Sequence, residues 1–556
     1  MAFNTTPLAR VWKLVKLEKI EIGSIYFYAV LSALIQLTLP VGIQAIISFV
    51  LGGAMTVSLV LLISLVVGGV LTSGLMQISQ MKLIEKIQQK IFVRYSFDIA
   101  KRLPRLDIEK ADGYYLPELV NRFFDTGTLQ KGLSKLLLDV PVATIQILAG
   151  LLLLAFYHPA FIVFGISIIL LLGIMLYFSG TRGLQTSLEE SKHKYGVAAW
   201  LEEIARMIYT FKFSGRPSIH MRKVDENTTH YLNARTSHFK ILLLQFRVLV
   251  GFKVLVTATL LIVGTLLLLE QQLTIGQFIA AEIIILTVIN AVEKLIANLD
   301  SVYDVLTAVD KLGKVTDKDV EEEGQYELPY EKKGLSLELR QVGFAYNNGT
   351  PVISNLSFSV APGEKVCIAG KNGSGKTTLL KLLAAAYQGY SGSILIDGIP
   401  LGNHQLTALR SNIGILPGTR DIFHGTLWEN IVMDNPHVTT ERVKRLSEKL
   451  GLSDFVASLS KGFDTVLDPV GKRLPFSVIQ KIKLLRALAC EPRLLLLEDP
   501  WEGMEADYKE RIENLLLHEL PNTTVITASN DAAFIKASNR VIALDAIVSP
   551  SNDKQS

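Results

Sequence analysis

The sequence predicts an all-α membrane domain with six spanning helices, followed by an α/β domain on the cytoplasmic side. Three observations support this prediction. The 556 residues are too many for one hydrophobic core. Apolar residues make up 49% of the chain and charged residues only 19%, a balance that favours membrane spans. The long apolar blocks end near Asp300, and the remaining sequence mixes apolar and charged residues as a soluble domain does.

We expect four segments along the chain. The acidic and polar stretch from Asp317 to Lys333 lacks apolar periodicity and is therefore interpreted as a linker. No short apolar segment with a small-residue cleavage site opens the chain, so no removable signal peptide is predicted. The predicted segments are a cytoplasmic N-terminal segment at 1–21, a membrane domain at 22–313, the linker at 314–334 and a soluble domain at 335–556.

The net charge and the cysteines exclude two classes of function. A net charge of +4 is small for this length, so no nucleic-acid partner is expected. Cys367 and Cys490 lie in apolar segments and lack the spacing of metal ligands. They are predicted to be reduced residues of the core.

Six apolar segments are long enough to cross a membrane, which requires roughly 20 mostly apolar residues. The first two are separated by a turn at Gly52 and Gly53. The expected spans are 22–48, 55–79, 138–157, 159–180, 247–269 and 275–297.

Lysine and arginine residues predict the orientation of these spans. The N-terminal stretch and the long connection at 80–137 are rich in basic residues, whereas the three short connections carry none. Basic segments stay on the cytoplasmic side. We therefore expect a multi-pass protein of the plasma (inner) membrane, with both termini and the soluble domain in the cytoplasm.

The long connections at 80–137 and 181–246 each have a break near the middle. The first break is at Leu103-Pro104 with Gly113, and the second is at Gly215-Arg216-Pro217. We predict that each connection is a helical arm whose turn contacts the soluble domain. The alternative is a loop that packs on itself.

Five polar residues fall within the expected spans, and Glu282 is the ionisable one. Such a residue usually faces a cavity or a partner helix. The alternative for Glu282 is a position near the outer interface, where the carboxylate stays hydrated, and the sequence leaves both open. The five residues are Gln36, Gln44, Gln146, Glu282 and Asn290.

A phosphate-loop signature lies in the soluble domain. A strand pattern from Glu364 to Gly370 runs into GxxxxGK[ST], the order that this motif requires. Loop N–H groups bind phosphates, Lys376 neutralises their charge, and the Thr377 hydroxyl is a ligand for Mg²⁺. We therefore predict a P-loop NTPase domain that binds ATP and Mg²⁺ through Gly370, Lys371, Asn372, Gly373, Ser374, Gly375, Lys376, Thr377 and Thr378.

An acidic pair follows a second buried strand. The run from Leu494 to Leu497 is typical of a buried parallel strand and ends in Glu498 and Asp499. Carboxylates at this end of a strand, beside a phosphate loop, bind Mg²⁺ and position an attacking water. Glu498 is therefore predicted as a metal ligand together with Thr377, and Asp499 as a catalytic position.

The order of these features resembles the ATP-binding cassette (ABC) exporters over nearly the whole chain. The resemblance implies a half-transporter, in which a six-span domain is fused to one cassette, and a Tyr346 ring that stacks on adenine. The segments 80–137 and 247–310 are more weakly similar to the type I secretion and peptide-export branch. The matching motifs are Phe344-Ala-Tyr346, Ile413 to Pro417, Asp421 to Ile431, Phe463 to Val466, and Arg486-Ala-Leu488.

The cassette motifs are degenerate at the residues that hydrolyse ATP. Gly418 replaces a glutamine, the segment from Leu474 to Val478 replaces LSGGQ, and Asn530 replaces a histidine. Glu498 and Asp499 stand where the family has Asp-Glu. The Asp499 carboxylate is one methylene shorter than a glutamate, and an asparagine cannot carry a proton. We predict that ATP binding is retained and that hydrolysis, with Asp499 and Asn530 as weak catalytic positions, is impaired.

The resemblance implies a subunit of a dimeric exporter that couples cassette closure to transport of a substrate across the lipid membrane. ABC transporters are ATPases, but the altered residues leave open whether this chain is an active enzyme. The alternative is a non-hydrolysing ATP-binding subunit that supports a competent partner. We expect a heterodimer with a second half-transporter, because a homodimer would have two impaired sites. The substrate is not identified, and a secretion role would add a periplasmic adaptor and an outer-membrane channel.

Overall fold

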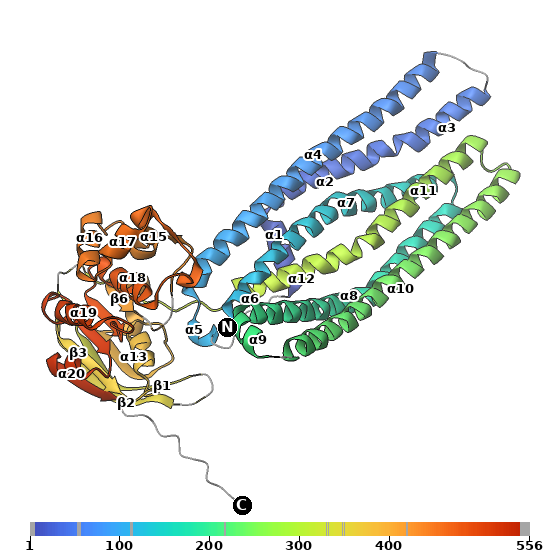
Figure 1. The fold of residues 1–556 in the computed structure, drawn as a ribbon. Coiled ribbons are helices and arrows are strands. Elements are labelled where there is room, and N and C mark those ends of the chain that lie inside the picture. The colour runs from blue at the N-terminus through green and yellow to red at the C-terminus, as the bar shows by residue number, and fades with distance from the viewer. Residues whose placement is uncertain are drawn as a thin grey trace, which may run out of the picture. The chain divides into compact units, whose positions relative to one another are not determined.

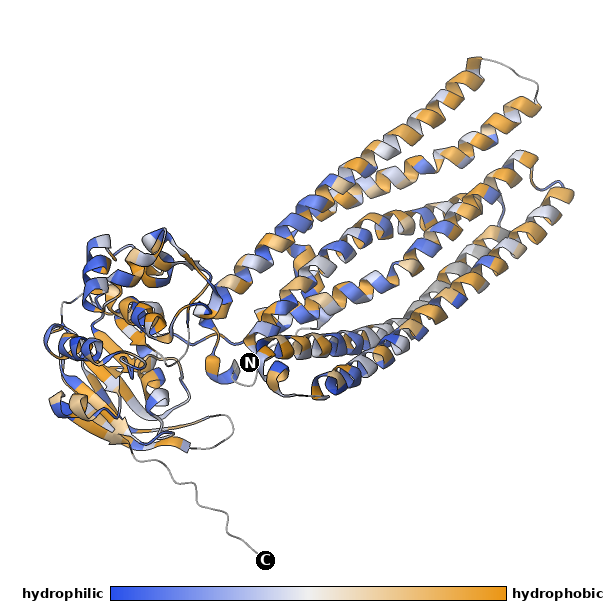
Figure 2. Ribbon diagram, in the orientation of Figure 1, coloured by the Kyte–Doolittle hydropathy of each residue, from blue (hydrophilic) through white to orange (hydrophobic). Residues whose placement is uncertain are grey.

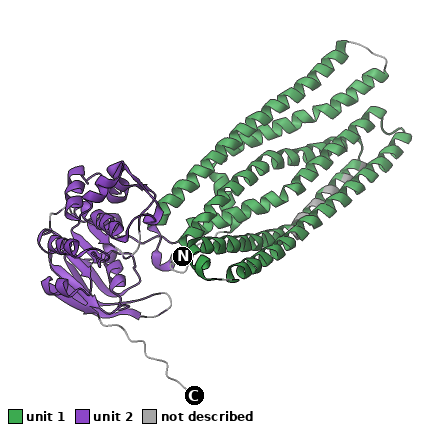
Figure 3. Ribbon diagram, in the orientation of Figure 1, with its two compact units in different colours: residues 1–104, 115–318 green, residues 105–114, 319–556 purple. Residues whose placement is uncertain are grey.

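The chain forms two compact units in a computed structural model (Figure 3). Unit 1 contains Met1–Pro104 and Tyr115–Lys318, and unit 2 contains Arg105–Tyr114 and Asp319–Ser556. The expected turn residues Gly53, Gly113, Arg216 and Pro217, and Pro417 of the matching motif, lie outside the described residues. The structure describes residues 6–52, 57–111, 115–215, 218–329, 331, 333–346, 349, 351–416, 418 and 421–544, apart from several side chains in 160–179.

In its described residues, unit 1 is helical (Figure 1). Its long helices are α1 (Pro7–Leu17), α2 (Lys19–Gln36), α3 (Thr38–Leu51), α4 (Val57–Arg102), α7 (Asp125–Tyr157), α8 (Ala160–Arg206), α10 (Ile219–Leu269), α11 (Ile275–Ala297) and α12 (Leu299–Thr316). Short helices are η1 (Leu103–Arg105), α6 (Leu116–Asn121), η2 (Arg122–Phe124) and α9 (Ile208–Phe213).

The described parts of the six expected spans lie in these helices. Figure 2 shows apolar residues along the span-containing part of α4 and α10 and more hydrophilic residues along their extensions. Five described helical segments are long and apolar enough to cross a membrane: Lys19–Leu51, Val57–Arg105, Leu116–Tyr157, Ile219–Leu269 and Ile275–Thr316. The expected span at 159–180 falls at the start of α8, where several side chains are not described.

The first expected span is two helices rather than one. Helix α2 ends at Gln36 and α3 begins at Thr38. Pro40 explains the break, because its ring lacks an N–H and clashes with the carbonyl group four residues earlier, which belongs to Gln36.

Polar residues within the expected spans contact neighbouring helices. The Gln36 side chain of α2 donates to the Ser73 hydroxyl of α4 at 2.9 Å and accepts from the Gln146 amide of α7 at 2.5 Å. The Gln44 side chain accepts from the Tyr157 hydroxyl at 2.5 Å. Such bonds hold membrane helices together. The side chains of these three glutamines thus contact neighbouring helices. Glu282 is half-buried on α11, and its role stays a prediction.

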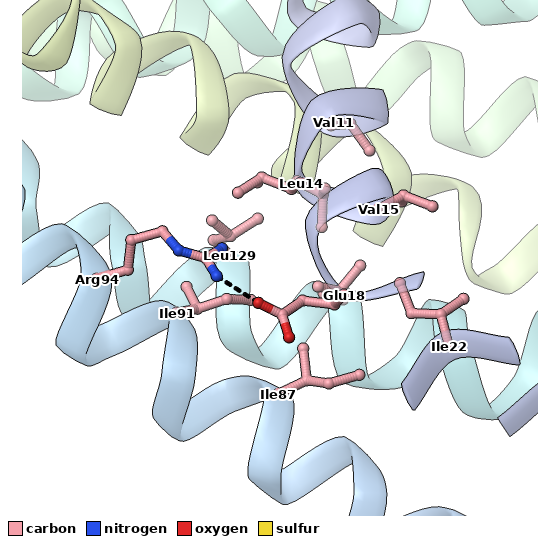
Figure 4. Close-up of a pocket in the computed structure, with 11 residues that line it drawn as sticks. Val11, Leu14, Val15, Glu18, Ile22, Ile87, Ile91, Arg94 and Leu129 are labelled. Atoms are coloured by element: carbon pink, nitrogen blue, oxygen red, sulfur yellow. Dashed lines mark hydrogen bonds and ion pairs between the residues drawn. The ribbon is translucent and has the colours of Figure 1, made fainter. Parts of the chain in front are cut away.

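The start of the chain packs against the long helices of unit 1. Figure 4 shows a small cavity lined by apolar side chains of α1, α2, α4, α7 and α12, with Glu18 pointing toward Arg94. Burial opposes ionisation of Glu18, but hydrogen bonds from Lys90 and Arg94 outweigh it and hold the pKa of this carboxyl below its usual value. Buried charges require such paired partners.

Unit 2 contains two main sheets. The antiparallel sheet has the order β2-β1-β4-β5, and the parallel sheet has the order β11-β3-β10-β9-β6. The antiparallel strands are β1 (Leu337–Ala345), β2 (Pro351–Val360), β4 (Ser391–Ile396) and β5 (Ile399–Pro400). The parallel strands are β3 (Lys365–Gly370), β6 (Ile413–Leu416), β9 (Leu494–Glu498), β10 (Thr524–Ala528) and β11 (Arg540–Leu544), and β7 (Gly425–Thr426) pairs with β8 (Val466–Leu467).

Helices accompany these strands. They are α5 (Ile108–Ala111), α13 (Lys376–Leu383), α14 (Leu406–Ser411), α15 (Leu427–Val432), α16 (Thr440–Lys449), α17 (Ser453–Ser458), α18 (Phe476–Ala489), α19 (Ala506–His518) and α20 (Ala532–Ala537), with η3 (Leu401–Asn403), η4 (Gly462–Asp464) and η5 (Pro469–Gly471). The four leucines of β9 are fully buried, as expected for a central parallel strand.

The turn of the first long connection belongs to unit 2. The Asp107 N–H donates to the Asp319 carbonyl at 3.1 Å, and the Glu321 N–H donates to the Arg105 carbonyl at 2.8 Å. The Glu109 carboxylate accepts from the Gly389 N–H at 2.9 Å. The predicted contact of this turn with the soluble domain is therefore confirmed.

Candidate nucleotide-binding site

The phosphate loop leaves the parallel sheet at the end of β3 and continues into α13. Gly373 and Gly375 have φ angles of 84° and 91°, in the left-handed region that favours glycine. Gly375 is the N-cap residue of α13. The strand, loop and helix that the motif requires are all present, and the loop leads to the positive end of the helix.

Lys376 lies across the loop. Its ammonium group donates to the Gly370 carbonyl at 2.6 Å and to the Lys371 carbonyl at 3.1 Å. Ser374 is 3% exposed, and its hydroxyl has no hydrogen-bond partner among the described residues. A buried polar atom of this kind fits a site whose ligand supplies oxygen atoms.

The two predicted metal ligands meet beside the loop. The Thr377 hydroxyl donates to Oε1 of Glu498. The Gly418 N–H donates to Oε2 of the same carboxylate at 3.1 Å. Hydroxyl and carboxylate oxygens are ligands that Mg²⁺ prefers, so this pair fits the expected ion.

The predicted catalytic positions lie at the same edge of the sheet, but their side chains bond to the protein. Oδ1 of Asp499 accepts from the Ser529 hydroxyl at 2.5 Å, and the Asp499 backbone has a φ of 35°. Oδ1 of Asn530 accepts from the Gly370 N–H at 3.0 Å. Their catalytic roles stay predictions.

Tyr346 is joined to the helix that follows the loop. Its hydroxyl is 3.0 Å from the Thr378 hydroxyl. Its ring stands edge-on to Phe344 and Tyr387, with centroids 5.2 and 5.7 Å away. These contacts fix the orientation of the ring, and its stacking on adenine stays a prediction.

The altered signature segment forms the start of α18. Pro475 is the N-cap residue and supplies no side-chain hydrogen bond. The half-buried Phe476 ring lies against Gly503, where a β-carbon would be 2.7 Å from Cδ1 of the ring. The helix therefore begins with a bulky side chain in place of bare backbone.

The sequence did not single out Ser529, Tyr387 or the Gly418 N–H as parts of the site. Ser529 directly precedes Asn530 at the end of β10, which is a local signal for its position. The other two contacts depend on how distant segments meet, and no spacing in the chain indicates them.

Both cysteines are free thiols, as predicted. Cys367 on β3 is fully buried, and burial raises the pKa of its thiol to about 11. Burial also raises the pKa of Cys490, which is partly exposed. Thiols with raised pKa are poor nucleophiles, so both residues contribute to packing.

Comparisons with known proteins identify two family regions in the chain. Residues 22–292 match the ABC transporter transmembrane region, and residues 353–502 match the ABC transporter model. The fold is similar to that of a bacterial Atm1-family ABC exporter solved with ATP bound, with a TM-score of 0.82 and 18% identity over 96% of this chain and 95% of that one.

Several curated proteins are related in sequence. YknV of Bacillus subtilis, an uncharacterized ABC transporter ATP-binding protein, is 30% identical over 39% of this chain. The ATP-dependent lipid A-core flippase of Burkholderia orbicola is 28% identical over 50%, and the alpha-hemolysin translocation ATP-binding protein HlyB of Escherichia coli O157:H7 is 29% identical over 49%. The matches span 36%, 46% and 39% of the lengths of these relatives, respectively.

Proposed function

The chain belongs to the ABC transporter family, and from this premise we propose that it is one subunit of a dimeric exporter. Its cassette binds ATP with Mg²⁺, and cassette closure is coupled to movement of a substrate across the membrane. The observation that carries this proposal is the arrangement of Lys376, Thr377 and Glu498 around one phosphate loop.

Each of these residues has a role that follows from its position. Loop N–H groups hold the phosphates, and the Lys376 ammonium neutralises their charge. Thr377 and Glu498 hold Mg²⁺, which when bound neutralises and orients the phosphate oxygens. Asn530 positions the first loop residue through the Gly370 N–H.

The substitution Lys376→Ala tests ATP binding. We expect a loss of ATP affinity of roughly 10- to 100-fold, because a hydrogen bond to a charged group contributes about 1.5–3 kcal/mol. The measurement is binding of a fluorescent ATP analogue to the purified full chain. Lys536→Ala, which changes an exposed lysine of α20, is the matched control. Unchanged binding in Lys376→Ala would show that the proposal is wrong.

A second function is supported by the contacts of Asp499 and Asn530. Ser529 and the Gly370 N–H engage the side-chain oxygens of these two residues. In this alternative, the chain is a non-hydrolysing subunit that binds ATP as a structural ligand and supports a competent partner. Impaired hydrolysis is part of both proposals.

Restoring the residues of the family tests the hydrolysis proposal. The combined variant carries Gly418→Gln, Glu498→Asp, Asp499→Glu and Asn530→His, with LSGGQ in place of Leu474 to Val478. We expect higher ATP turnover than in the wild type, since a positioned general base contributes roughly 10²–10⁴-fold. If ATP is bound normally and turnover does not rise, hydrolysis is limited by other residues.

The location and partners are proposed on the same basis. The distribution of lysine and arginine supports a plasma (inner) membrane protein with its termini and cassette in the cytoplasm. A homodimer of this chain would contain two impaired sites. We therefore propose a heterodimer with a second half-transporter. Similarity to HlyB supports the secretion branch, and neighbouring genes for a periplasmic adaptor and an outer-membrane channel are the observation that checks it.

A further inference from the structure

We propose that Gly418 and Glu498 form an interdependent pair that sets how tightly the site holds its divalent cation. This inference rests on the proposed function, because the cation accompanies the nucleotide. It concerns a glycine for which the P-loop motif itself has no role. The Glu498 carboxylate joins two segments that are distant in sequence.

Both oxygens of this carboxylate are engaged. Oε1 accepts from the Thr377 hydroxyl at the start of α13, 121 residues away in the sequence. Oε2 accepts from the Gly418 N–H, 80 residues away, at 3.1 Å. Because β6 and β9 are parallel neighbours, residue 418 follows β6 at the same edge where Glu498 ends β9. The carboxylate therefore ties the segment after β6 to the phosphate-loop helix.

The space for this carboxylate exists because residue 418 has no side chain. A β-carbon at position 418 would lie 3.0 Å from Oε2 of Glu498 and 3.3 Å from its Cδ. Both distances are shorter than an ordinary van der Waals contact, so the carboxylate would have to move. The φ angle of Gly418 lies outside the left-handed region, so its backbone conformation does not by itself require glycine. The obstacle to a side chain is the Glu498 carboxylate.

A glutamate at position 498 therefore requires that residue 418 has no side chain, so the two positions are coupled. With glutamate, the carboxylate reaches both Thr377 and the Gly418 N–H. With aspartate, it would be set back by about 1.5 Å, the length of one C–C bond, and would leave room for a β-carbon at 418. A side chain at 418 should thus disturb the cation site when residue 498 is glutamate, and do little when residue 498 is aspartate.

A cycle of single and double variants tests this coupling in the full chain. The variants are Gly418→Ala, Glu498→Asp and the two combined. Gly402→Ala is the matched control, because a β-carbon at Gly402 would meet nothing within 4 Å. The measurement is binding of a fluorescent ATP analogue, first in EDTA and then in a titration with MgCl₂. The readout is the half-saturating Mg²⁺ concentration.

We expect Gly418→Ala to raise the half-saturating Mg²⁺ concentration by roughly tenfold, while binding in EDTA stays as in the wild type. The double variant should need no more Mg²⁺ than Glu498→Asp alone. The inference would be overturned if the double variant raised the half-saturating Mg²⁺ concentration by the product of the two single effects. It would also be overturned if Gly418→Ala left this concentration unchanged. An equal loss of binding with and without Mg²⁺ would likewise overturn it, because it would show a general structural defect.

The same experiment separates this inference from the proposed function. If Gly418→Ala binds the ATP analogue in EDTA as the wild type does and has the same half-saturating Mg²⁺ concentration, Gly418 and Glu498 are not interdependent. That result would leave the proposed ATP binding unaffected. A wild type that binds no nucleotide under either condition would overturn the proposed function and, with it, the pair.

Discussion

Asn530 illustrates how a changed side chain acquires a positioning role. The family resemblance places a histidine here, a residue able to carry a proton. In this chain, Oδ1 of Asn530 accepts a hydrogen bond from the Gly370 N–H at 3.0 Å. The bond holds the first residue of the phosphate loop, 160 residues away in the sequence. We therefore expect Asn530 to support nucleotide binding by positioning the loop, a role that is independent of hydrolysis.

We predict that Asn530→Ala lowers ATP affinity by about fivefold, since one hydrogen bond contributes about 1 kcal/mol net. The effect should appear in EDTA as well as in Mg²⁺, because the bond is to the loop backbone. Binding of a fluorescent ATP analogue measures it, and Asn522→Ala, an exposed asparagine before β10, is the control. Wild-type affinity in Asn530→Ala would contradict the positioning role.

Strand β3 carries the loop and begins with a buried lysine. Lys365 is 5% exposed, and its ammonium donates to the carbonyl groups of Leu520 and Thr523, in the turn before β10. Burial lowers the pKa of Lys365 to about 8, from an ordinary value of 10.5. The lysine thus joins two neighbouring strands of the parallel sheet while its charged form is disfavoured.

This lowered pKa predicts how stability depends on pH. Between pH 8 and 10.5 the folded state has lost the Lys365 proton that the unfolded state still binds. The contribution of Lys365 to the free energy of unfolding therefore rises with pH across this window and is constant below it. The measurement is thermal unfolding of wild type and Lys365→Met at several pH values. The unfolding temperature of the wild type should rise relative to that of Lys365→Met as the pH rises from 8 to 10.5. A relative fall would contradict the assignment of the lowered pKa to Lys365.

Helix breaks show the limits of a hydropathy pattern at the level of elements. The apolar block at 22–48 predicts one span, and Lys19–Leu51 is long and apolar enough to be one, but Pro40 divides it into two helices, α2 and α3. Hydropathy counts apolar residues and does not weigh the lost N–H of a proline. Four of the other expected spans lie in longer helices, α4, α7, α8 and α10, which continue beyond the apolar segment, whereas α11 has the bounds of the expected span 275–297.

At the scale of the whole molecule, the two compact units are not separated by a single boundary in the sequence. Residues 105–114, from the first long connection, belong to unit 2 although they are flanked by helices of unit 1. The Glu109 carboxylate accepts from the Gly389 N–H, and a β-carbon at Gly389 would lie 2.2 Å from a Glu109 oxygen. The expected division at a single linker therefore omits this segment.

The proposed heterodimer predicts a difference in turnover between assemblies. The purified chain alone should bind ATP and hydrolyse it slowly, because each site of a homodimer would contain the altered residues. Co-purification with a half-transporter encoded by a neighbouring gene should raise turnover by roughly 100-fold, the lower end of the range that a catalytic base contributes. Phosphate release per ATP-binding site measures it. Full activity of the chain alone would contradict the heterodimer.

Local patterns in the sequence were sufficient to predict the membrane domain, the P-loop domain and the order of their parts. A span is a contiguous apolar segment, and the phosphate loop is a contiguous motif, so both are determined by neighbouring residues. The resemblance of the altered motifs likewise indicated Gly418, Glu498, Asp499 and Asn530 as positions of interest. None of these patterns shows which atoms meet.

Only the tertiary structure decided how these positions combine. Glu498 reaches both Thr377 and Gly418 because β3, β6 and β9 end at one edge of the parallel sheet. Asn530 meets Gly370 because β10 pairs with β3. Long-range contacts of this kind depend on strand order and packing, which no local spacing encodes. The sequence by itself therefore predicts a site for nucleotide, and the fold determines which side chains contact the phosphate loop.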